Sequence, residues 1–157
     1  MSDTRRQQCI TALATAMATI TTANGYQTNA GSNVRVDPDK DLQPLSAAIT
    51  TAITVRETGG AEQAGMVGEN FGVIEVDLVA QARGTASESV DQKCRQIAGD
   101  INISIGEDKT LGGLADDVVV SSHAFEVSQG KDRIGSMTIS ARLSYRTARF
   151  DPFTAAT

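Results

Sequence analysis

Residues 86–115, ASESVDQKCRQIAGDINISIGEDKTLGGLA, decide the fold of this chain. At about 100° per residue, the apolar side chains of this stretch fall on one side of a helix and the polar side chains on the other. The apolar stripe comprises Val90, Cys94, Ile97, Ala98, Ile101 and Ile105, and the polar side comprises Asp91, Gln92, Arg95, Gln96 and Asn102. The stretch therefore predicts an amphipathic helix whose apolar stripe packs against another layer.

The ends of this helix carry residues that favour a start and a stop. Thr85 and Glu88 fit a capping box, in which a hydroxyl and a carboxylate three residues apart satisfy free backbone N–H groups. Gly106 favours the stop because glycine readily adopts the left-handed conformation. Gly112 and Gly113 come just before the next strand, where we expect a turn with positive φ or a close backbone approach.

One apolar residue of this helix lies off the stripe. On helical geometry, Ile103 points about 140° away from the centre of the stripe. Either the helix has frayed by this residue, or Ile103 contacts a second neighbour such as another subunit. We favour the subunit contact.

Length and charge limit the class of protein. With 157 residues the chain can bury one core, and we expect a single domain over residues 1–147 followed by a surface tail at 148–157. The net charge of −5 argues against binding to duplex DNA through its phosphates. Because no apolar run approaches the ~20 residues that span a bilayer, we do not expect an integral membrane protein.

The N-terminus and the cysteines indicate the compartment. Arg5 and Arg6 are not followed by the apolar segment of a secretory signal, so we expect the protein in the cytosol after synthesis. Cys9 and Cys94 each fall on the apolar side of a predicted helix. We therefore expect two buried free thiols rather than a disulfide.

A second helix is predicted over roughly residues 3–22. Its other side, with Thr11, Thr15 and Thr22, is unusual because threonine is a poor helix former, so we expect this helix to depend on packing against a sheet. Its apolar stripe comprises Cys9, Ile10, Leu13, Ala16, Met17 and Ile20.

The segment 27–44 is typical of a loop around a short apolar piece, Val34–Val36. Residues 37–41 begin like a calcium-binding loop, D-x-D-x-D, but that pattern needs a glycine at its sixth position and a glutamate at its twelfth. Leu42 and Ala48 occupy those positions. We therefore expect a solvated turn.

Four longer strands are predicted over residues 46–57, 71–83, 118–129 and 134–146, from their β-branched content and period-two alternation. They form two hairpins, the second turning at 130–133. The glycine-rich stretch 58–70 is a long loop in the first hairpin, either a flexible tip or a binding loop. Together these elements predict an α+β fold: a two-layer sandwich with a mainly antiparallel four-stranded sheet packed by two helices.

No pattern of catalytic or ligand-binding residues is found. We expect His123, the only histidine, to face inward or to lie at the sheet edge, and Ser121 and Ser122 are its neighbours along one strand rather than members of a triad. One histidine and two distant cysteines make no zinc site, and the glycine motifs of nucleotide-binding loops are missing. We therefore predict no enzyme, no catalytic residue, no cofactor and no metal ligand.

Charged residues on the last strand are the best candidate contact residues, together with Ile103. Arg142, Arg146 and Arg149 line one face of this strand and its exit. They form either a solvated charged face or ion pairs across a subunit interface, and we favour the interface over nucleic-acid binding because the chain is acidic. The acidic candidates for such ion pairs are Glu75, Asp77 and Asp151.

Three stretches of the chain carry a family resemblance. They are ATITTANGY at 18–26, AGDINISIGEDKTLGGLADDV at 98–118 and SYRTARFDPF at 144–153. The most telling pieces are AGDI at 98–101 with LGGLA at 111–115, and YRT at 145–147 with Asp151 and Pro152. Over most of its length, the chain resembles the tail terminator (tail completion) proteins of long-tailed bacteriophages.

The resemblance implies a sheet flanked by helices, a homohexameric ring and no catalytic residues. In that family the ring caps the tail tube, stops its polymerisation and presents a surface to the head. The implied partners are other copies of the chain, the tail tube protein and the head–tail connector protein. DNA passes through such a ring without sequence-specific binding, and no membrane is involved. The implied location is the head-proximal end of the virion tail, after assembly in the host cytoplasm.

Two alternatives remain open from the sequence. Another head–tail joining protein, such as a head completion or neck protein, is the nearest. A small-molecule-binding α+β module is the more distant alternative, since it would need a concave pocket with converging polar groups.

Overall fold

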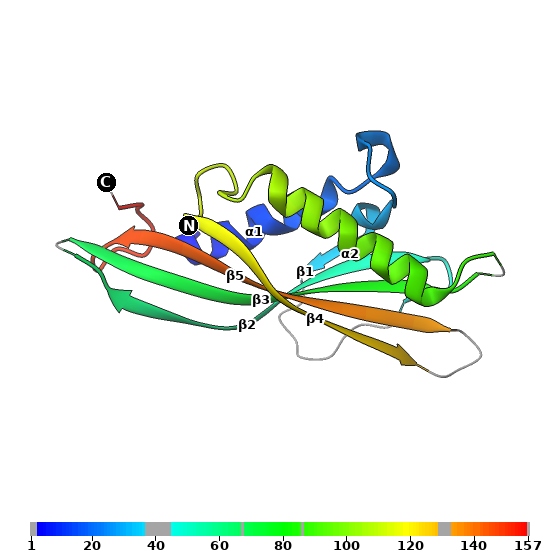
Figure 1. Ribbon diagram of the computed structural model, residues 1–157. Coiled ribbons are helices and arrows are strands. Elements are labelled where there is room, and N and C mark those ends of the chain that lie inside the picture. The colour runs from blue at the N-terminus through cyan, green and yellow to red at the C-terminus, as the bar shows by residue number, and fades with distance from the viewer. Residues whose placement is uncertain (1–2, 37–44, 67, 86, 129–132, 157) are drawn as a thin grey trace.

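The structure is a computed structural model that describes residues 3–36, 45–66, 68–85, 87–128 and 133–156. In this part of the chain, two α-helices lie on one face of a five-stranded sheet (Figure 1). The helices are α1 (Arg5–Ala18) and α2 (Val90–Glu107), with short 3-10 turns η1 (Thr22–Asn24) and η2 (Ala30–Asn33). The strands are β1 (Val34–Val36), β2 (Thr51–Ala64), β3 (Glu69–Arg83), β4 (Asp117–Ser128) and β5 (Ile134–Ala148).

The sheet has the strand order β1-β2-β3-β5-β4, and β1 is parallel to β2 whereas the other pairs are antiparallel. The α+β class with two helices is confirmed, but the four-stranded antiparallel sheet is wrong in detail, because the sheet is mixed and has five strands. Val34 pairs with Ile53 and Val36 with Val55. A strand of three residues shows too little alternation for its partner to be predicted.

The glycine-rich stretch 58–70 was expected to be a loop, and this prediction is wrong. β2 continues to Ala64 and β3 begins at Glu69. Gly60 pairs with Ile74 and Gln63 with Phe71, so this part of β2 belongs to the sheet. The end of β2 is exposed and therefore lacks apolar alternation, although its backbone is paired with β3. Of the predicted turn at 130–133, residues 130–132 lie outside the described residues, and so does the calcium-like run at 37–41.

The core lies between the helices and the sheet. Every residue of the predicted α2 stripe is buried, which confirms that prediction, and of the α1 stripe only Ala16 is half-buried rather than buried. Cys9 and Cys94 are free and buried, as expected. From the sheet, the core receives Ile53, Val55, Ile74, Val76, Leu78, Ile139, Ala141, Leu143 and Tyr145.

The start and the stop of α2 differ from the predicted signals. Its N-cap is Ser89, whose hydroxyl accepts a backbone hydrogen bond from the first turn. The Thr85 hydroxyl instead accepts the backbone N–H of Glu88 at 3.3 Å, in a turn that precedes the helix. Gly106 lies inside the helix rather than at its end.

The turn that follows α2 has the predicted conformation. Gly112 and Gly113 have φ of 71° and 82°, and Leu111 before them also has a positive φ of 51°. The Asp108 carboxylate holds this turn, because it accepts the backbone N–H groups of Thr110 at 3.0 Å and Gly112 at 2.6 Å. The glycines therefore allow backbone conformations that larger residues rarely adopt.

A buried carboxylate joins α2 to the segment after α1. Asp100 is 1% exposed. Its Oδ1 accepts the backbone N–H of Gln27 at 3.0 Å, and its Oδ2 accepts the backbone N–H and the hydroxyl of Thr28 at 2.8 and 2.7 Å. Hydrogen bonds to a charged group are the stronger kind, so Asp100 fixes the path of the chain from α1 toward β1.

We expect Asp100→Ala to lower the free energy of unfolding by about 2–3 kcal/mol, because it leaves three donors without their acceptor. Denaturant unfolding of the variant and the wild type measures this difference. Asn102→Ala, on the exposed side of the same helix, is the matched control and should change stability by about 0.5 kcal/mol or less. Equal effects of the two substitutions would contradict the role of Asp100.

Candidate interaction surface

One face of the sheet points away from both helices (Figure 1). Part of this face carries exposed side chains, and we term that patch the open face. Strand pairing places Glu75 opposite Arg142, Phe71 opposite Arg146, and Val119 beside Arg142 on β4. Phe71 is 38% exposed and Val119 is 52% exposed. The open face, defined by these five residues, therefore mixes apolar and charged side chains.

On β2 and β3 the open face is confined to the half of the sheet nearer the β2–β3 turn. Further along, Val79 and Gln81 on the same side of the sheet are buried. There Arg83 donates through Nη2 to the carbonyl oxygens of Leu45 and Ser46 at 3.1 and 3.3 Å. The chain thus returns to this side of the sheet at Leu45.

Two of the predicted contact residues, Glu75 and Arg142, come together on the open face. They are register partners on neighbouring strands and both are exposed. Neither side chain forms a hydrogen bond or an ion pair with another residue that the structure describes. Opposite charges at this spacing can interact with each other or with a partner.

Two other predicted contact residues are engaged within the chain. Asp77 accepts Arg56 Nη2 at 3.0 Å and Ser140 Oγ at 2.8 Å, and its side chain is only 16% exposed. Arg146 pairs with Asp116 at 3.1 Å, but its side chain stays 54% exposed. Arg146 therefore remains accessible to a partner, whereas Asp77 stabilises the sheet.

Arg149 and Asp151 lie beyond the end of β5. The Arg149 guanidinium is 5.2 Å from the centroid of the Phe150 ring. Asp151 accepts the Thr154 hydroxyl at 2.6 Å and the Phe153 backbone N–H at 3.0 Å, and these bonds lower the pKa of its carboxyl group. The Asp151 carboxylate thus shapes a turn of the C-terminal segment.

Ile103 lies in the helix layer, away from the open face. It is 54% exposed, and the helix continues past it to Glu107. Fraying therefore does not explain its position off the apolar stripe. Its contact with another subunit stays a prediction.

The apolar part of the open face was missed in the sequence. Phe71 lies on the same side of β3 as Glu75. A large apolar residue on the polar side of an alternating strand could have indicated an interaction surface from the sequence. Val119 gave no signal, because three consecutive valines at 118–120 hide the alternation. The strand also has a register irregularity between Val120 and Ser122.

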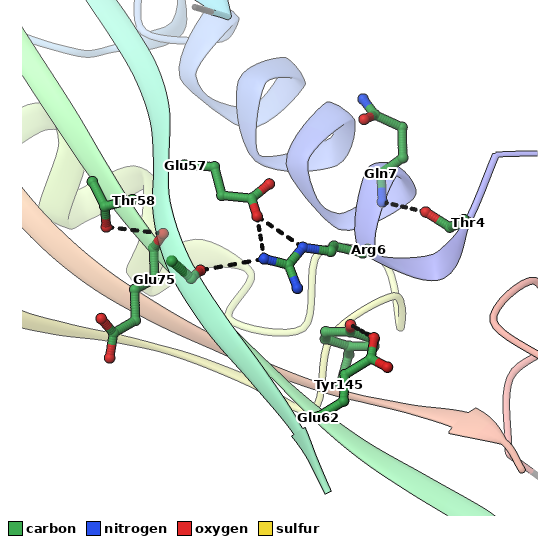
Figure 2. Close-up of polar contacts among 9 residues, drawn as sticks. Thr4, Arg6, Gln7, Glu57, Thr58, Glu62, Glu75 and Tyr145 are labelled. Carbon is green, nitrogen blue, oxygen red and sulfur yellow. Dashed lines mark hydrogen bonds and ion pairs between the residues drawn. The ribbon is translucent and has the colours of Figure 1, made fainter. Parts of the chain in front are cut away.

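A polar cluster that was not predicted joins α1 to the sheet. Arg6 of α1 donates through Nε and Nη2 to Glu57 Oε1 on β2, and the Tyr145 hydroxyl of β5 donates to Glu62 Oε1 at 2.9 Å. Figure 2 shows the Arg6 guanidinium between Glu57 and the Tyr145–Glu62 pair. Three elements far apart in the sequence are thereby tied together.

Two glycines leave room for this cluster. A Cβ atom on Gly72 would overlap the Tyr145 ring, and one on Gly60 would lie 2.9 Å from Arg6 Nη2. Glycine in a strand interior often marks such a close approach. Packing therefore favours glycine at both positions, and Gly60 belongs to the part of β2 that was expected to be a loop.

The pKa of Tyr145 shows what the cluster can do chemically. Burial, followed by the hydrogen bond to Glu62, raises the pKa of Tyr145 to about 12. A hydroxyl that keeps its proton to that pH is a poor general base near neutrality. The cluster is consistent with a structural link between helix and sheet.

His123 and the serines beside it do not form a triad. His123 is exposed on β4, so of its two expected placements the sheet edge is confirmed. Ser121 Oγ donates to the Ser140 carbonyl oxygen at 3.0 Å. Among the described residues, no three His, Cys, Asp or Glu side chains are grouped so that they could hold a metal ion.

A scan of the chain against models of protein families found no match, and a search of curated proteins found none either. Of the helices in the described part of the chain, none combines the length and the apolar character needed to cross a bilayer. The functional inference therefore rests on the resemblance in the sequence and on the geometry of the described residues.

Tyr145→Phe removes the hydroxyl bond to Glu62, and we expect it to lower the free energy of unfolding by about 1 kcal/mol near neutral pH. The difference should shrink as the pH rises from 10 toward about 12, because the unfolded wild type releases the tyrosine proton near pH 10 and the folded state holds it to about 12. Denaturant unfolding of both proteins over this pH range measures the effect. A difference that does not change with pH would contradict it.

Proposed function

We propose that this chain is a structural virion protein that assembles as a ring, a homohexamer, on the head-proximal end of a phage tail tube. There it stops polymerisation of the tube and forms the surface that joins tail to head. The observation that carries the proposal is the open face, where the exposed Phe71 lies opposite Arg146 and the exposed Val119 lies opposite Arg142. On this face Glu75 and Arg142 have no side-chain partner among the described residues.

The composition of the open face supports a protein contact. Aromatic residues and arginine are enriched at protein interfaces, and exposed apolar patches rimmed by polar residues mark interaction sites. A ring also needs two different contact surfaces on each copy. The open face on the sheet and the exposed Ile103 in the helix layer are two different surfaces, which is the condition for head-to-tail contacts.

The assignment to a phage tail rests on the family resemblance of residues 98–118 and 144–153. These two stretches meet in the fold, because the Asp116 backbone N–H donates to the Ser144 carbonyl oxygen at 2.7 Å. The Arg146–Asp116 ion pair joins them a second time. Pieces that resemble the family in sequence thus form one continuous part of the structure.

The proposed partners are other copies of the chain, the tail tube protein and the head–tail connector protein. The ring would assemble in the host cytoplasm and remain in the virion, with DNA passing through it. The net charge of −5 accords with passage of DNA through the ring rather than with binding to DNA phosphates.

A head completion or neck protein is the second candidate, since it would also need a protein-contact surface such as the open face.

Electron microscopy of particles that lack this protein separates the two candidates. For a tail terminator we expect tails of uncontrolled length that are not attached to heads, because nothing stops tube growth. Heads that leak DNA beside tails of normal length would point to head completion instead.

Arg142→Glu tests the open face as a contact surface. We expect it to weaken assembly by about tenfold or more, which corresponds to about 1.4 kcal/mol, because it places like charges at Glu75 and position 142 and removes an arginine from the contact. Sedimentation velocity over a range of concentrations measures the shift.

Arg95→Glu, on the exposed side of α2, is the control and should leave assembly unchanged, since it alters the same net charge away from the open face. Equal weakening by both variants would show that net charge alone is responsible. A wild-type protein that stays monomeric at high concentration and does not bind tail tubes would count against the ring.

A further inference from the structure

Phe150 is presented to solvent in a strained conformation. Its side chain is 87% exposed and its φ is 63°. A bulky residue at positive φ is uncommon, and strain of this kind persists only where the surrounding structure imposes it. The Arg149 guanidinium over its ring adds a positive charge to the same projection. We term Phe150 with Arg149 the C-terminal knob.

Hydrogen bonds to two other segments hold the C-terminal knob in place. The Arg149 backbone N–H donates to the Gly68 carbonyl oxygen at 2.8 Å, which ties it to the β2–β3 turn. The Pro152 carbonyl oxygen accepts the Arg5 backbone N–H at 2.8 Å, which ties it to the start of α1. A segment whose backbone is held in this way loses little backbone conformational entropy on binding.

A groove of about 510 Å³ lies between α1 and the turn that follows α2. This volume falls in the range of about 300–1,000 Å³ that is usual for binding pockets. Its apolar lining includes Ala12, Ala16, Leu111 and Leu114, and its acidic residues are Asp3 and Asp108.

The threonine-rich side of α1 also lines this groove. Thr15 Oγ1 donates to the Thr11 carbonyl oxygen at 2.9 Å, and Thr19 Oγ1 donates to the Ala16 carbonyl oxygen at 2.7 Å. Because these hydroxyls bond to the backbone of their own helix, the groove receives a more apolar surface than the sequence suggests. These threonines are exposed and do not belong to the core, and a contact in the groove would explain why this side of α1 is rich in threonine.

We propose that this groove receives the C-terminal knob of a second copy of the chain. Aromatic anchors seated in pockets supply much of the free energy of protein association. The charges are complementary, since the knob carries Arg149 and the groove carries Asp3 and Asp108. Hydrogen bonds from the Thr110 side chain and the Gly112 backbone lower the pKa of Asp108, which keeps that carboxylate ionised.

The contact joins two different surfaces, so it links copies head to tail. Each copy offers one knob and one groove, and such contacts give a closed ring when the rotation between copies closes. The inference rests on the proposed ring function and names one of the contacts that would build the ring.

Disulfide cross-linking tests the contact directly. A chain with Phe150→Cys is mixed with a chain with Thr15→Cys and oxidised, and we expect a linked dimer from the mixture but not from either variant alone. Cys9 and Cys94 are 0% exposed, and burial raises the pKa of each thiol to about 11, so neither should react. Gln92→Cys, on the exposed side of α2, replaces Thr15→Cys in the control mixture and should give no dimer.

A chain that carries both Phe150→Cys and Thr15→Cys distinguishes contacts between copies from contacts within one copy. We expect a ladder of linked chains from this double variant. A monomer with an internal disulfide would overturn the proposal, as would a mixture of single variants that gives no more dimer than the Gln92→Cys control.

Phe150→Ala supplies a second measurement, because it removes an exposed side chain and should not disturb folding. We expect assembly to weaken at least tenfold in sedimentation velocity, whereas Phe153→Ala, at a 48% exposed residue, should have little effect. If the wild type forms rings and Phe150→Ala assembles equally well, the knob contact is wrong and the ring stands. If the wild type is monomeric throughout and binds no tail tube, the proposed function fails with it.

Discussion

Both helices pack on the same face of the sheet, and this one-sided packing determines the role of each strand residue. Ile74, Val76 and Leu78 of β3 point to the helices and are buried. Full burial of such side chains stabilises the fold by roughly 1.5–3 kcal/mol each, so a slip of one residue in strand register would be strongly unfavourable. The residues between them must face solvent, a returning segment of the chain or a partner. The open face is the part that no described segment covers.

This constraint explains how much of the fold could be predicted. The α2 stripe and the alternation in β3 and β5 record which side chains face the core, so the helix–sheet layering follows from the sequence. The pairing of β1 does not, because three residues give no period and their partner is not adjacent in the sequence. Gly60 misled the prediction, since a Cβ atom there would lie 2.4 Å from the Val73 carbonyl oxygen and 2.9 Å from Arg6 Nη2, and these restrictions come from residues distant in the sequence.

The candidate contact residues show a similar limit. Strand parity in the sequence places the acidic and basic side chains of β3 and β5 on one face, and the strand register places Glu75 opposite Arg142. Ion pairs of these residues across a subunit interface stay a prediction. Whether such a charge is engaged depends on neighbours from other strands and turns. Asp77 is held by Arg56, and Arg146 is paired with a residue of the turn before β4. Those partners are nonlocal, so periodicity alone cannot separate engaged from accessible charges.

Arg5 connects the two surfaces that the proposed ring would bring together. Its backbone N–H donates to the Pro152 carbonyl oxygen, next to the C-terminal knob, and its Nη2 donates to the Gly113 carbonyl oxygen at 2.6 Å, in the turn beside the groove. A head-to-tail ring closes only if the rotation from copy to copy is constant. The relative position of the knob and the groove within one copy determines that rotation. Arg5 is hydrogen-bonded next to both surfaces and so helps to fix their relative position. The adjacent Arg6 fixes the same turn of α1 to β2 through Glu57.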